Sequence, residues 1–318
     1  MFARRWFSRD WETVHEGREG WLFLTGGSNR VMDQYRGGLA QWWHLRAWAR
    51  LIEARAARAN RLGIRCLQFL VPEKLSVYDN FTDGLPYDPA RASTRRLARR
   101  LARQPAYLDL LAPFRAARGG PVPLYLRTDT HWSAEGCLLA YREVMRALGA
   151  VPPPDIAARP VHVEEQVLDL GAKLPGRPAE ALVRPLIQRD AVRVETGPLL
   201  AAYEAAGRAR DLHVGAHAVY RNASPAADPR RVVLFGDSYA HFAPILLTGL
   251  LAESFSEVHF VWSSSFDWGY VERVAPDILL FELAERFLAR LPADDFDVAA
   301  GRRVGQAQAQ GPDRHALS

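Results

Sequence analysis

The feature that most constrains the fold of this chain is the run VVLFGDSYA at residues 232–240. Its first four residues are apolar without polar alternation, which is typical of a strand buried on both faces of a parallel sheet. Gly236 then permits a tight turn, and Ser238 follows where the strand ends. Apolar side chains recur at helical spacing from about residue 240 to 253, so we expect a helix there. Such a strand–turn–helix unit indicates an α/β fold, whose ligands bind at the carboxyl ends of the strands.

The rest of the chain alternates apolar strand-like runs with amphipathic helical runs. The pattern predicts strands at 21–24, 64–71, 122–126, 258–262 and 277–282, and helices at 39–62, 89–103, 134–148 and 281–291. This alternation indicates a three-layer α/β domain with a mainly parallel sheet. We expect a single domain over residues 1–299, with an irregular insertion or lid of a few short strands at about 151–229, and a disordered tail at 300–318.

Ser238 has two interpretations on this stretch alone. Ser and Asp often cap helices, so Ser238 or Asp237 can simply be a cap, and we first weigh this above catalysis. Alternatively, a serine at the crevice can act as a nucleophile, with helix-start amides stabilising the oxyanion. The stretch is not the G-x-S-x-G turn of α/β-hydrolases. A nucleophilic serine therefore needs a base from elsewhere in the chain.

The segment RTDTHW at residues 127–132 offers that base. It follows a predicted strand and should reach the same sheet edge as Ser238. Asp129 is close enough to His131 to orient the imidazole, whose other nitrogen can then take the serine proton. Three alternatives compete. The pair can bind a metal, although no third and fourth ligands are evident; it can be an Asx-turn with a structural histidine; or His241 can be the base, although we expect a helix to carry it away.

The composition narrows the classes of partner. The net charge of +5 over 318 residues comes from arginine, since Lys74 and Lys173 are the only lysines. No zinc-finger, RRM or helix-turn-helix signature is evident, so we expect no nucleic-acid partner. The arginines at 95–103 are expected to form a solvated helix face, and the tryptophans at 42–48 to pack in the core. We find no apolar run of transmembrane length and no signal peptide, so the chain as written is expected in the cytoplasm.

Five motifs carry a family resemblance. GWLFL, PEKLSVY, RTDTHW, LFGDSY and ERFL resemble, in this order, the SGNH-hydrolase-like family of alginate O-acetylation proteins, the AlgX/AlgJ group. The resemblance runs from about residue 17 to 291 and implies an SGNH-hydrolase-like fold. It implies that Ser238 is the nucleophile, His131 the general base and acid, and Asp129 the orienting acid. It further implies acetyl transfer to an exopolysaccharide through an acetyl-serine intermediate. Members usually act in the periplasm.

Residues beside these motifs are candidates for the oxyanion hole and the pocket. The backbone N–H of Ser238 is the expected first oxyanion donor, and Gly171 in LDLG is a candidate for the second. Glu285 and Arg286 of ERFL are expected to form a structural ion pair. No metal and no organic cofactor is expected. The pocket candidates, each of which could equally be structural, are Lys74, Tyr78, Arg127, Trp132 and Tyr239.

Three functions are open at this point. The leading hypothesis is a carbohydrate O-acetyltransferase, whose partners would be a glycan acceptor, an acetyl donor and other subunits of a polysaccharide acetylation complex. The second is a carbohydrate acetylesterase, which uses the same triad and gives the acyl group to water. The third is a non-catalytic polysaccharide-binding subunit of a biosynthetic complex. Acceptor binding and water exclusion separate the first two, and neither can be read from a sequence.

Overall fold

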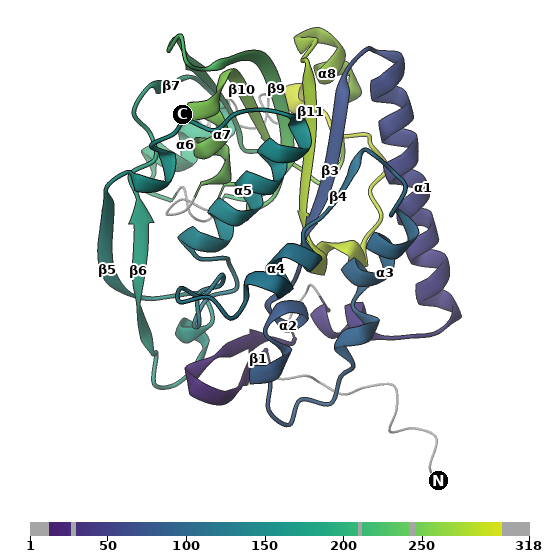
Figure 1. Cartoon of the computed structure of the whole chain (residues 1–318), viewed down its shortest axis with the longest axis vertical. Helices are drawn as coiled ribbons and strands as arrows, with labels where there is room; N and C mark the ends of the chain where they lie inside the picture. The colour runs from purple at the N-terminus through teal and green to yellow at the C-terminus, as the bar shows by residue number, and fades with distance from the viewer. Residues whose placement is uncertain (1–12, 27–29, 209–211, 242–245, 301–318) are drawn as a thin grey trace, which may run out of the picture.

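The computed structural model describes residues 13–26, 30–208, 212–241 and 246–300 (Figure 1). Its centre is a seven-stranded sheet of order β4-β3-β11-β9-β10-β8-β7. The strands from β4 to β10 are parallel to one another, whereas β8 and β7 continue the sheet antiparallel. This confirms the mainly parallel sheet. In chain order these strands are β3 Arg65–Val71, β4 Tyr107–Asp109, β7 Ala191–Thr196, β8 His217–Asn222, β9 Asp228–Gly236, β10 Phe255–Trp262 and β11 Ile278–Ala284.

Helices cover both faces of this sheet and complete the three layers. On one face lie α5 and α7, and on the other lie α1, α3 and α8. The α-helices are α1 Leu39–Arg61, α2 Lys74–Val77, α3 Ser93–Arg100, α4 Leu111–Ala117, α5 Ala134–Leu148, α6 Pro198–Ala205, α7 Leu247–Ser254 and α8 Trp268–Val274. Ser133 caps α5, since its hydroxyl accepts a hydrogen bond from the Gly136 amide.

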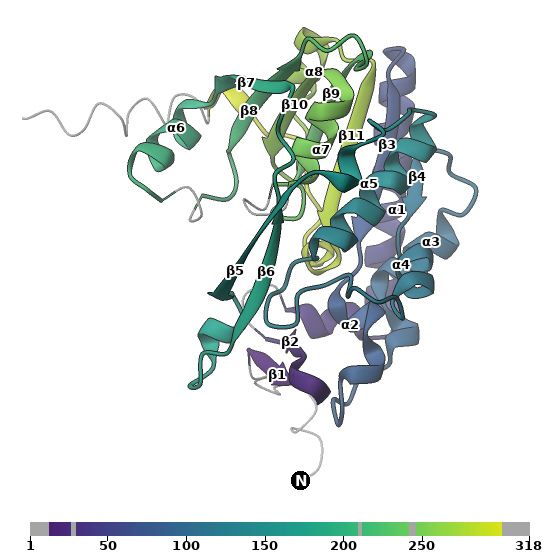
Figure 2. The ribbon, with the colours of Figure 1, turned by 60° about the vertical axis from the view of Figure 1, so that its left-hand side comes forward.

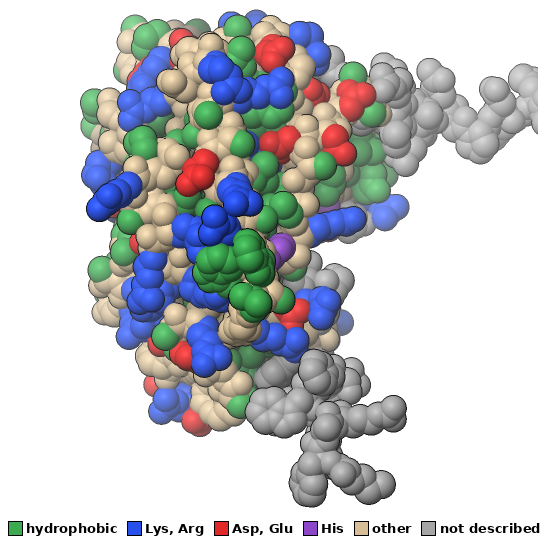
Figure 3. All heavy atoms as spheres, turned by 90° about the vertical axis from the view of Figure 1, so that its right-hand side faces the viewer, with side chains coloured by type: hydrophobic (Ala, Val, Ile, Leu, Met, Phe, Trp, Pro, Cys, Tyr) green, Lys and Arg blue, Asp and Glu red, His purple; other side chains and the backbone are tan. Residues whose placement is uncertain are grey.

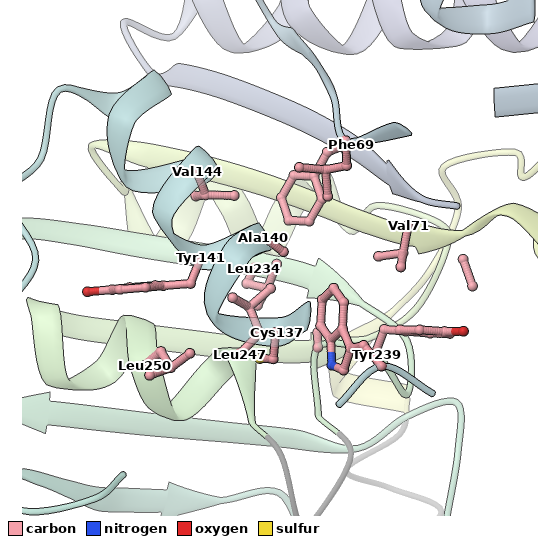
Figure 4. Close-up of a cluster of buried hydrophobic side chains, with 14 of the residues drawn as sticks. Phe69, Val71, Cys137, Ala140, Tyr141, Val144, Leu234, Tyr239, Leu247 and Leu250 are labelled. Atoms are coloured by element: carbon pink, nitrogen blue, oxygen red, sulfur yellow. The ribbon is translucent and has the colours of Figure 1, made fainter. Parts of the chain in front are cut away.

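The strand β9 shows why its sequence is apolar without alternation. Val232 and Leu234 face the cluster under α5 and α7, part of which is drawn in Figure 4, whereas Val233 and Phe235 face the cluster under α1. All four side chains are fully buried. A strand with a helix layer on each face has no solvent side, so no position in it is left for a polar residue.

Three predicted elements near the carboxyl edge of the sheet differ from the structure, two in kind and one in its starting residue. The predicted strand at 122–126 is no part of the sheet, and only an isolated bridge joins Tyr125 to Trp132. The helix predicted from residue 240 begins at Leu247, after a turn at 238–240, and its residues 242–245 lie outside the described part. Among the described residues, no helix begins between Ser238 and His241. The helix predicted at 281–291 is instead the end of β11 followed by a 3₁₀ turn, Glu285–Ala289.

The segment expected to be an insertion with a few short strands contains β5 to β8. A long antiparallel hairpin, β5 Val161–Val167 with β6 Ala179–Pro185, stands off the body of the domain (Figure 2). However, β7 and β8 belong to the central sheet, so this part of the expectation is wrong. The tail expected to be disordered lies almost wholly outside the described residues. A second two-stranded sheet, β1 Val14–Glu16 with β2 Leu22–Leu24, closes the amino-terminal end.

The tryptophans of α1 divide between core and surface. Trp48 is fully buried and donates its indole N–H to the Leu288 carbonyl at 2.9 Å. Trp43 is 54% exposed, so the expectation of core packing is right for Trp48 and wrong for Trp43. No helix in the described ranges combines the length and the apolar character needed to cross a bilayer.

Candidate active site

Ser238 lies in a tight turn directly after β9, and the turn is fixed by the carboxylate of Asp237. One oxygen of that carboxylate accepts from the Tyr239 amide at 2.8 Å, and the other accepts from the Ala284 amide of β11 at 2.7 Å. Ser238 itself is half-buried, whereas Asp237 is buried. Because both carboxylate oxygens of Asp237 are used in this way, the residue shapes the turn that presents the serine.

A second carboxyl group, that of Glu282 in β11, lies directly under this turn. Its Oε2 accepts from the Asp237 amide at 3.0 Å, and the side chain is fully buried. Burial and the neighbouring charge of Asp237 raise the pKa of Glu282 well above its usual range. Burial also raises the pKa of Asp237. Two buried carboxyls this close do not both ionise, so we assign the proton to Glu282.

Asp129 and His131 form the hydrogen-bonded pair that the sequence predicts. Asp129 Oδ1 lies 2.7 Å from His131 Nδ1 and accepts from the His131 amide at 2.8 Å. Burial by itself would raise the pKa of Asp129, but the charge and hydrogen bonds of His131, with the Asp169 amide, lower it to about 2. Asp129 is therefore ionised at neutral pH and favours the tautomer with hydrogen on Nδ1. In that tautomer the other ring nitrogen, Nε2, is the basic one.

The loop of His131 and the turn of Ser238 are in direct contact through Tyr239. The Tyr239 hydroxyl donates to the Thr130 carbonyl, and its ring centroid lies 5.0 Å from that of His131 and 5.2 Å from that of Trp132. Tyr239 is fully buried (Figure 4). The structure thus brings the segments of the three predicted triad residues to one place at the carboxyl edge of the sheet.

Arg286 is a buried side chain that joins four of the five motifs. Its Nε donates to Glu73 at 2.6 Å, and its Nη2 donates to the Tyr239 hydroxyl at 2.8 Å and to the Thr130 carbonyl at 3.4 Å. The expected ion pair with Glu285 is wrong, because Arg286 pairs with Glu73. Glu285 instead accepts hydrogen bonds from Ser76 and Thr94.

The other pocket candidates are mostly buried supports of the His131 loop. Lys74 donates to the carbonyls of Leu126 at 2.7 Å and Arg127 at 3.0 Å, and burial lowers its pKa to about 8 in spite of four nearby carboxylates. The Tyr78 hydroxyl accepts from the Leu124 amide. Trp132 is fully buried, whereas Arg127 is exposed, with its guanidinium 5.9 Å from the centre of the Trp21 ring.

Gly171 lies near the loop but its amide is already in use. The N–H donates to the Thr128 carbonyl at 3.0 Å, so in this conformation it is not directed at a substrate. A Cβ at this position would come 2.5 Å from the Pro178 carbonyl oxygen, which explains why glycine stands here. The backbone of Gly171 therefore holds the RTDTHW loop from below.

Asp169 is the residue of this region that the sequence analysis missed. Its carboxylate accepts from the amide and the hydroxyl of Thr130, at 2.8 and 2.6 Å, and its amide donates to Asp129. The only signal was its place in LDLG, beside Gly171. With Asp129 and His131 it forms a group whose ligand atoms lie within 4.8 Å of one another. Because these atoms already accept or donate hydrogen bonds within the chain, the group orients the histidine and is poorly suited to a metal.

His241, the alternative base, packs against Phe260 of β10. Its ring stacks on Phe260 with centroids 4.6 Å apart, and burial lowers its pKa to about 4. A neutral ring held flat against an apolar neighbour suits a packing role. The helix expected to carry it away from Ser238 is not formed at this position.

An apolar cavity of about 410 Å³ lies behind the loop, between α5 and the β5–β6 hairpin. Tyr125, Leu126 and Ser133 form its wall on the loop side, and Val183 lines it from the hairpin. Ser238, His131 and Asp129 do not line this cavity. We therefore do not place the proposed chemistry in it.

Comparison with known proteins identifies the fold. The chain matches a solved O-acetyltransferase domain of Pseudomonas putida AlgJ with 19% identity and a TM-score of 0.58, covering 92% of this chain and 99% of that one. It matches Bacillus cereus PatB1 with 16% identity and a TM-score of 0.58, covering 85% and 95%. At these identities the likeness concerns the fold alone.

Sequence comparisons identify the family. A curated relative, "Probable alginate O-acetylase AlgJ" of Pseudomonas fluorescens, is 24% identical over 157 residues, which are 46% of this chain and 38% of that protein. The matched stretch thus spans well under half of the relative. The family described as "SGNH hydrolase-like domain, acetyltransferase AlgX" matches residues 14–266. With most of its length matched, and with the SGNH-like α/β fold in place, the chain belongs to the AlgX family of SGNH-hydrolase-like acetyltransferase domains.

Proposed function

We propose that this chain transfers acetyl groups to hydroxyls of a carbohydrate through an acetyl-serine intermediate on Ser238. The observation that carries the proposal is the 2.7 Å contact between Asp129 and His131, in a loop packed by Tyr239 against the turn of Ser238. Membership of an acetyltransferase family supports the acyl chemistry. Relatives named for alginate O-acetylation support a polysaccharide as the acceptor.

The proposed reaction has two symmetrical halves. His131 Nε2 takes the proton of the Ser238 hydroxyl as the oxygen attacks the acetyl carbonyl of the donor. The backbone N–H of Ser238 stabilises the oxyanion, and collapse of the tetrahedral intermediate breaks the bond to the leaving group, which receives the proton from His131. An acceptor hydroxyl then attacks the acetyl-serine, and His131 takes its proton and returns it to Ser238. Asp129 stays ionised throughout and holds the imidazole in place.

Incubation with an activated aryl acetate, with and without soluble oligosaccharides, tests this proposal. We expect release of the aryl group, acetylated sugars in the mass spectrum, and loss of both on Ser238→Ala substitution. Ser256→Ala is the matched control, since Ser256 donates to a backbone carbonyl at the start of β9, away from the site. Equal turnover by wild type and Ser238→Ala would rule out the serine mechanism. Hydrolysis without transfer to any acceptor would assign the chain to the esterases.

A further inference from the structure

A second surface of the molecule, on the outer side of α1 and α3, combines tryptophan with arginine. We call it the Trp–Arg face and define it by Trp42, Trp43 and Arg46 of α1 and by Arg96, Arg99 and Arg100 of α3. The guanidinium carbons of Arg46 and Arg100 each lie 5.3 Å from the centre of the Trp42 ring. A hollow of about 430 Å³ beside them is lined by Trp42, Leu45, Arg96, Arg99 and Arg100. Figure 3 shows this side of the molecule, with a compact hydrophobic cluster among many basic side chains.

No carboxylate of the described residues balances the positive charge of the Trp–Arg face. Among the described residues, no carboxylate forms an ion pair with Arg46, Arg96, Arg99 or Arg100, although ion pairs of arginine are frequent elsewhere in the fold. Partial burial and then the charges of Arg100 and Arg91 lower the pKa of Arg96, which reflects the same crowding of like charge. An arrangement of this kind attracts an anionic partner.

Exposed apolar side chains lie in the first two turns of α1, beside the Trp–Arg face. Leu39 is 71% exposed and Trp43 is 54% exposed. Tryptophan beside arginine on a helix surface is typical of segments that lie at the boundary between lipid headgroups and water. A sugar ring is a poorer fit for Trp42, because two guanidinium groups already lie against it. Those guanidinium groups still present N–H edges, and their planar geometry suits phosphate oxygens.

We propose that the Trp–Arg face docks on an anionic phospholipid surface. The arginines would bind the phosphate groups, and Trp43 and Leu39 would enter the interfacial layer. This surface is separate from the residues around Ser238, so the proposal is independent of the acetyl-transfer chemistry. It concerns how the folded domain lies on a membrane and requires no membrane-spanning segment.

Co-sedimentation of the whole chain with lipid vesicles tests the proposal. We expect binding to mixed phosphatidylcholine–phosphatidylglycerol vesicles at low salt, weakened by added salt. The double variant Arg99→Gln/Arg100→Gln should bind about 10- to 30-fold more weakly, since each basic residue near such a surface contributes on the order of tenfold or less. Both side chains are exposed, so the fold should be unaffected, which thermal unfolding checks. Arg61→Gln/Arg177→Gln, two exposed arginines outside the face, is the matched control and should bind as wild type.

A third variant and a competing ligand complete the test. Trp43→Ala should weaken vesicle binding while leaving the charge unchanged. Equal binding to neutral phosphatidylcholine vesicles, or no effect of Arg99→Gln/Arg100→Gln, would overturn the proposal. Binding of soluble polygalacturonate that depends on Arg99 and Arg100, without binding to vesicles, would overturn it too, because it would assign the face to an acidic polysaccharide.

Discussion

The turn that carries Ser238 and the loop that carries His131 are positioned in different ways. Ser238 lies in the turn after β9, which pairs with β10 on one side and β11 on the other. Asp237, between the strand and Ser238, accepts a hydrogen bond from the backbone of β11. The His131 loop contributes no strand to the sheet and is held by side chains from distant segments, among them Lys74, Glu180 and Asp169. Backbone pairing fixes one side of the site, and buried polar side chains fix the other.

This difference predicts that substitutions on the two sides of the site have different consequences. A change in the loop's supports should move His131 while the sheet and Ser238 stay in place. A change under the Ser238 turn should instead lower the stability of the sheet core. The following predictions test that contrast, in order of decreasing expected effect.

Asp129→Asn should have the largest effect. The amide cannot hold the imidazole in the required tautomer, so we expect kcat for an activated acetyl ester to fall by about 10³- to 10⁴-fold. Steady-state kinetics measures the effect, with Asp83→Asn at an exposed position as the control. A decrease of less than about tenfold would correspond to less than about 1.4 kcal/mol of transition-state stabilisation. That result would mean that Asp129 does not orient the base.

Arg286→Met should break the link between the two sides. It leaves the Glu73 carboxylate buried without its cation, which costs about 3–5 kcal/mol of unfolding free energy. Urea denaturation measures the loss, and Arg290→Met, at an exposed position on the same segment, is the control. Combining it with Glu73→Gln should recover part of the loss, because the unpaired charge is then gone. Equal stability of Arg286→Met and wild type would contradict the role of Arg286.

Acid should weaken the loop side through Asp129. Its pKa is about 2 in the folded chain and 3.8 in the reference state, so the folded form gains stability above pH 4 that is lost as the pH falls toward 2. The loss should be about 2 kcal/mol, since each pKa unit corresponds to about 1.4 kcal/mol. The difference in unfolding free energy between wild type and Asp129→Asn should therefore shrink over this range. A difference independent of pH would contradict the ionised pair.

Gly236→Ala should strain the serine side. An added Cβ would lie 2.8 Å from the Ala240 Cβ and 3.0 Å from Glu282 Oε2, so we expect a loss of about 1–3 kcal/mol from overpacking. Gly176→Ala is the matched control, because no atom lies within 4 Å of a Cβ at that position. Equal denaturation midpoints for the two variants would show that the turn is less tightly packed than described.

Glu180→Gln should loosen the loop alone. Its carboxylate accepts from the amides of Arg127 and Thr128 and from the Thr128 hydroxyl, and an amide can replace only part of these bonds. We expect a loss of about 1 kcal/mol and faster hydrogen exchange at Arg127 and Thr128, with unchanged exchange in β9. Glu165→Gln, on the exposed side of the same hairpin, is the control. Exchange that rises equally in β9 would contradict the independence of the two sides.

The contrast between the Ser238 turn and the His131 loop also decides how much of the fold and of the site could be predicted from the sequence. The apolar run at 232–235 predicts a strand buried on both faces, because every residue of a strand without a solvent side must be apolar. All four residues are indeed buried. The position of the RTDTHW loop cannot be predicted from its own residues, because distant side chains hold it. Lys74 and Glu180, which form hydrogen bonds with the backbone of Arg127, lie 53 residues before it and 53 residues after it. The pairing of Asp129 with His131 can be predicted because the two residues lie only two positions apart.

The wrong predictions have the same origin. The adjacency of Glu285 and Arg286 predicts an ion pair between them, although the partner of Arg286 is Glu73, 213 residues away. The helical spacing after Ser238 predicted a helix from residue 240, but Ala240 instead accepts bonds from Thr248, and the helix begins later. Trp43 follows the same stripe as Trp48, yet it is 54% exposed and no element in the described part of the chain covers it. Periodicity predicts which residues share a face, and only the tertiary fold decides what covers that face.

The central claim is that Ser238 becomes acetylated with His131 as the base. Rapid quenching after mixing with an activated acetyl ester, followed by peptide mass spectrometry, tests it directly. We predict one added acetyl group on the peptide that contains Ser238, absent from Ser238→Ala and strongly reduced in His131→Ala. Acetylation at another residue, or equal labelling of Ser238 in His131→Ala, would contradict the account.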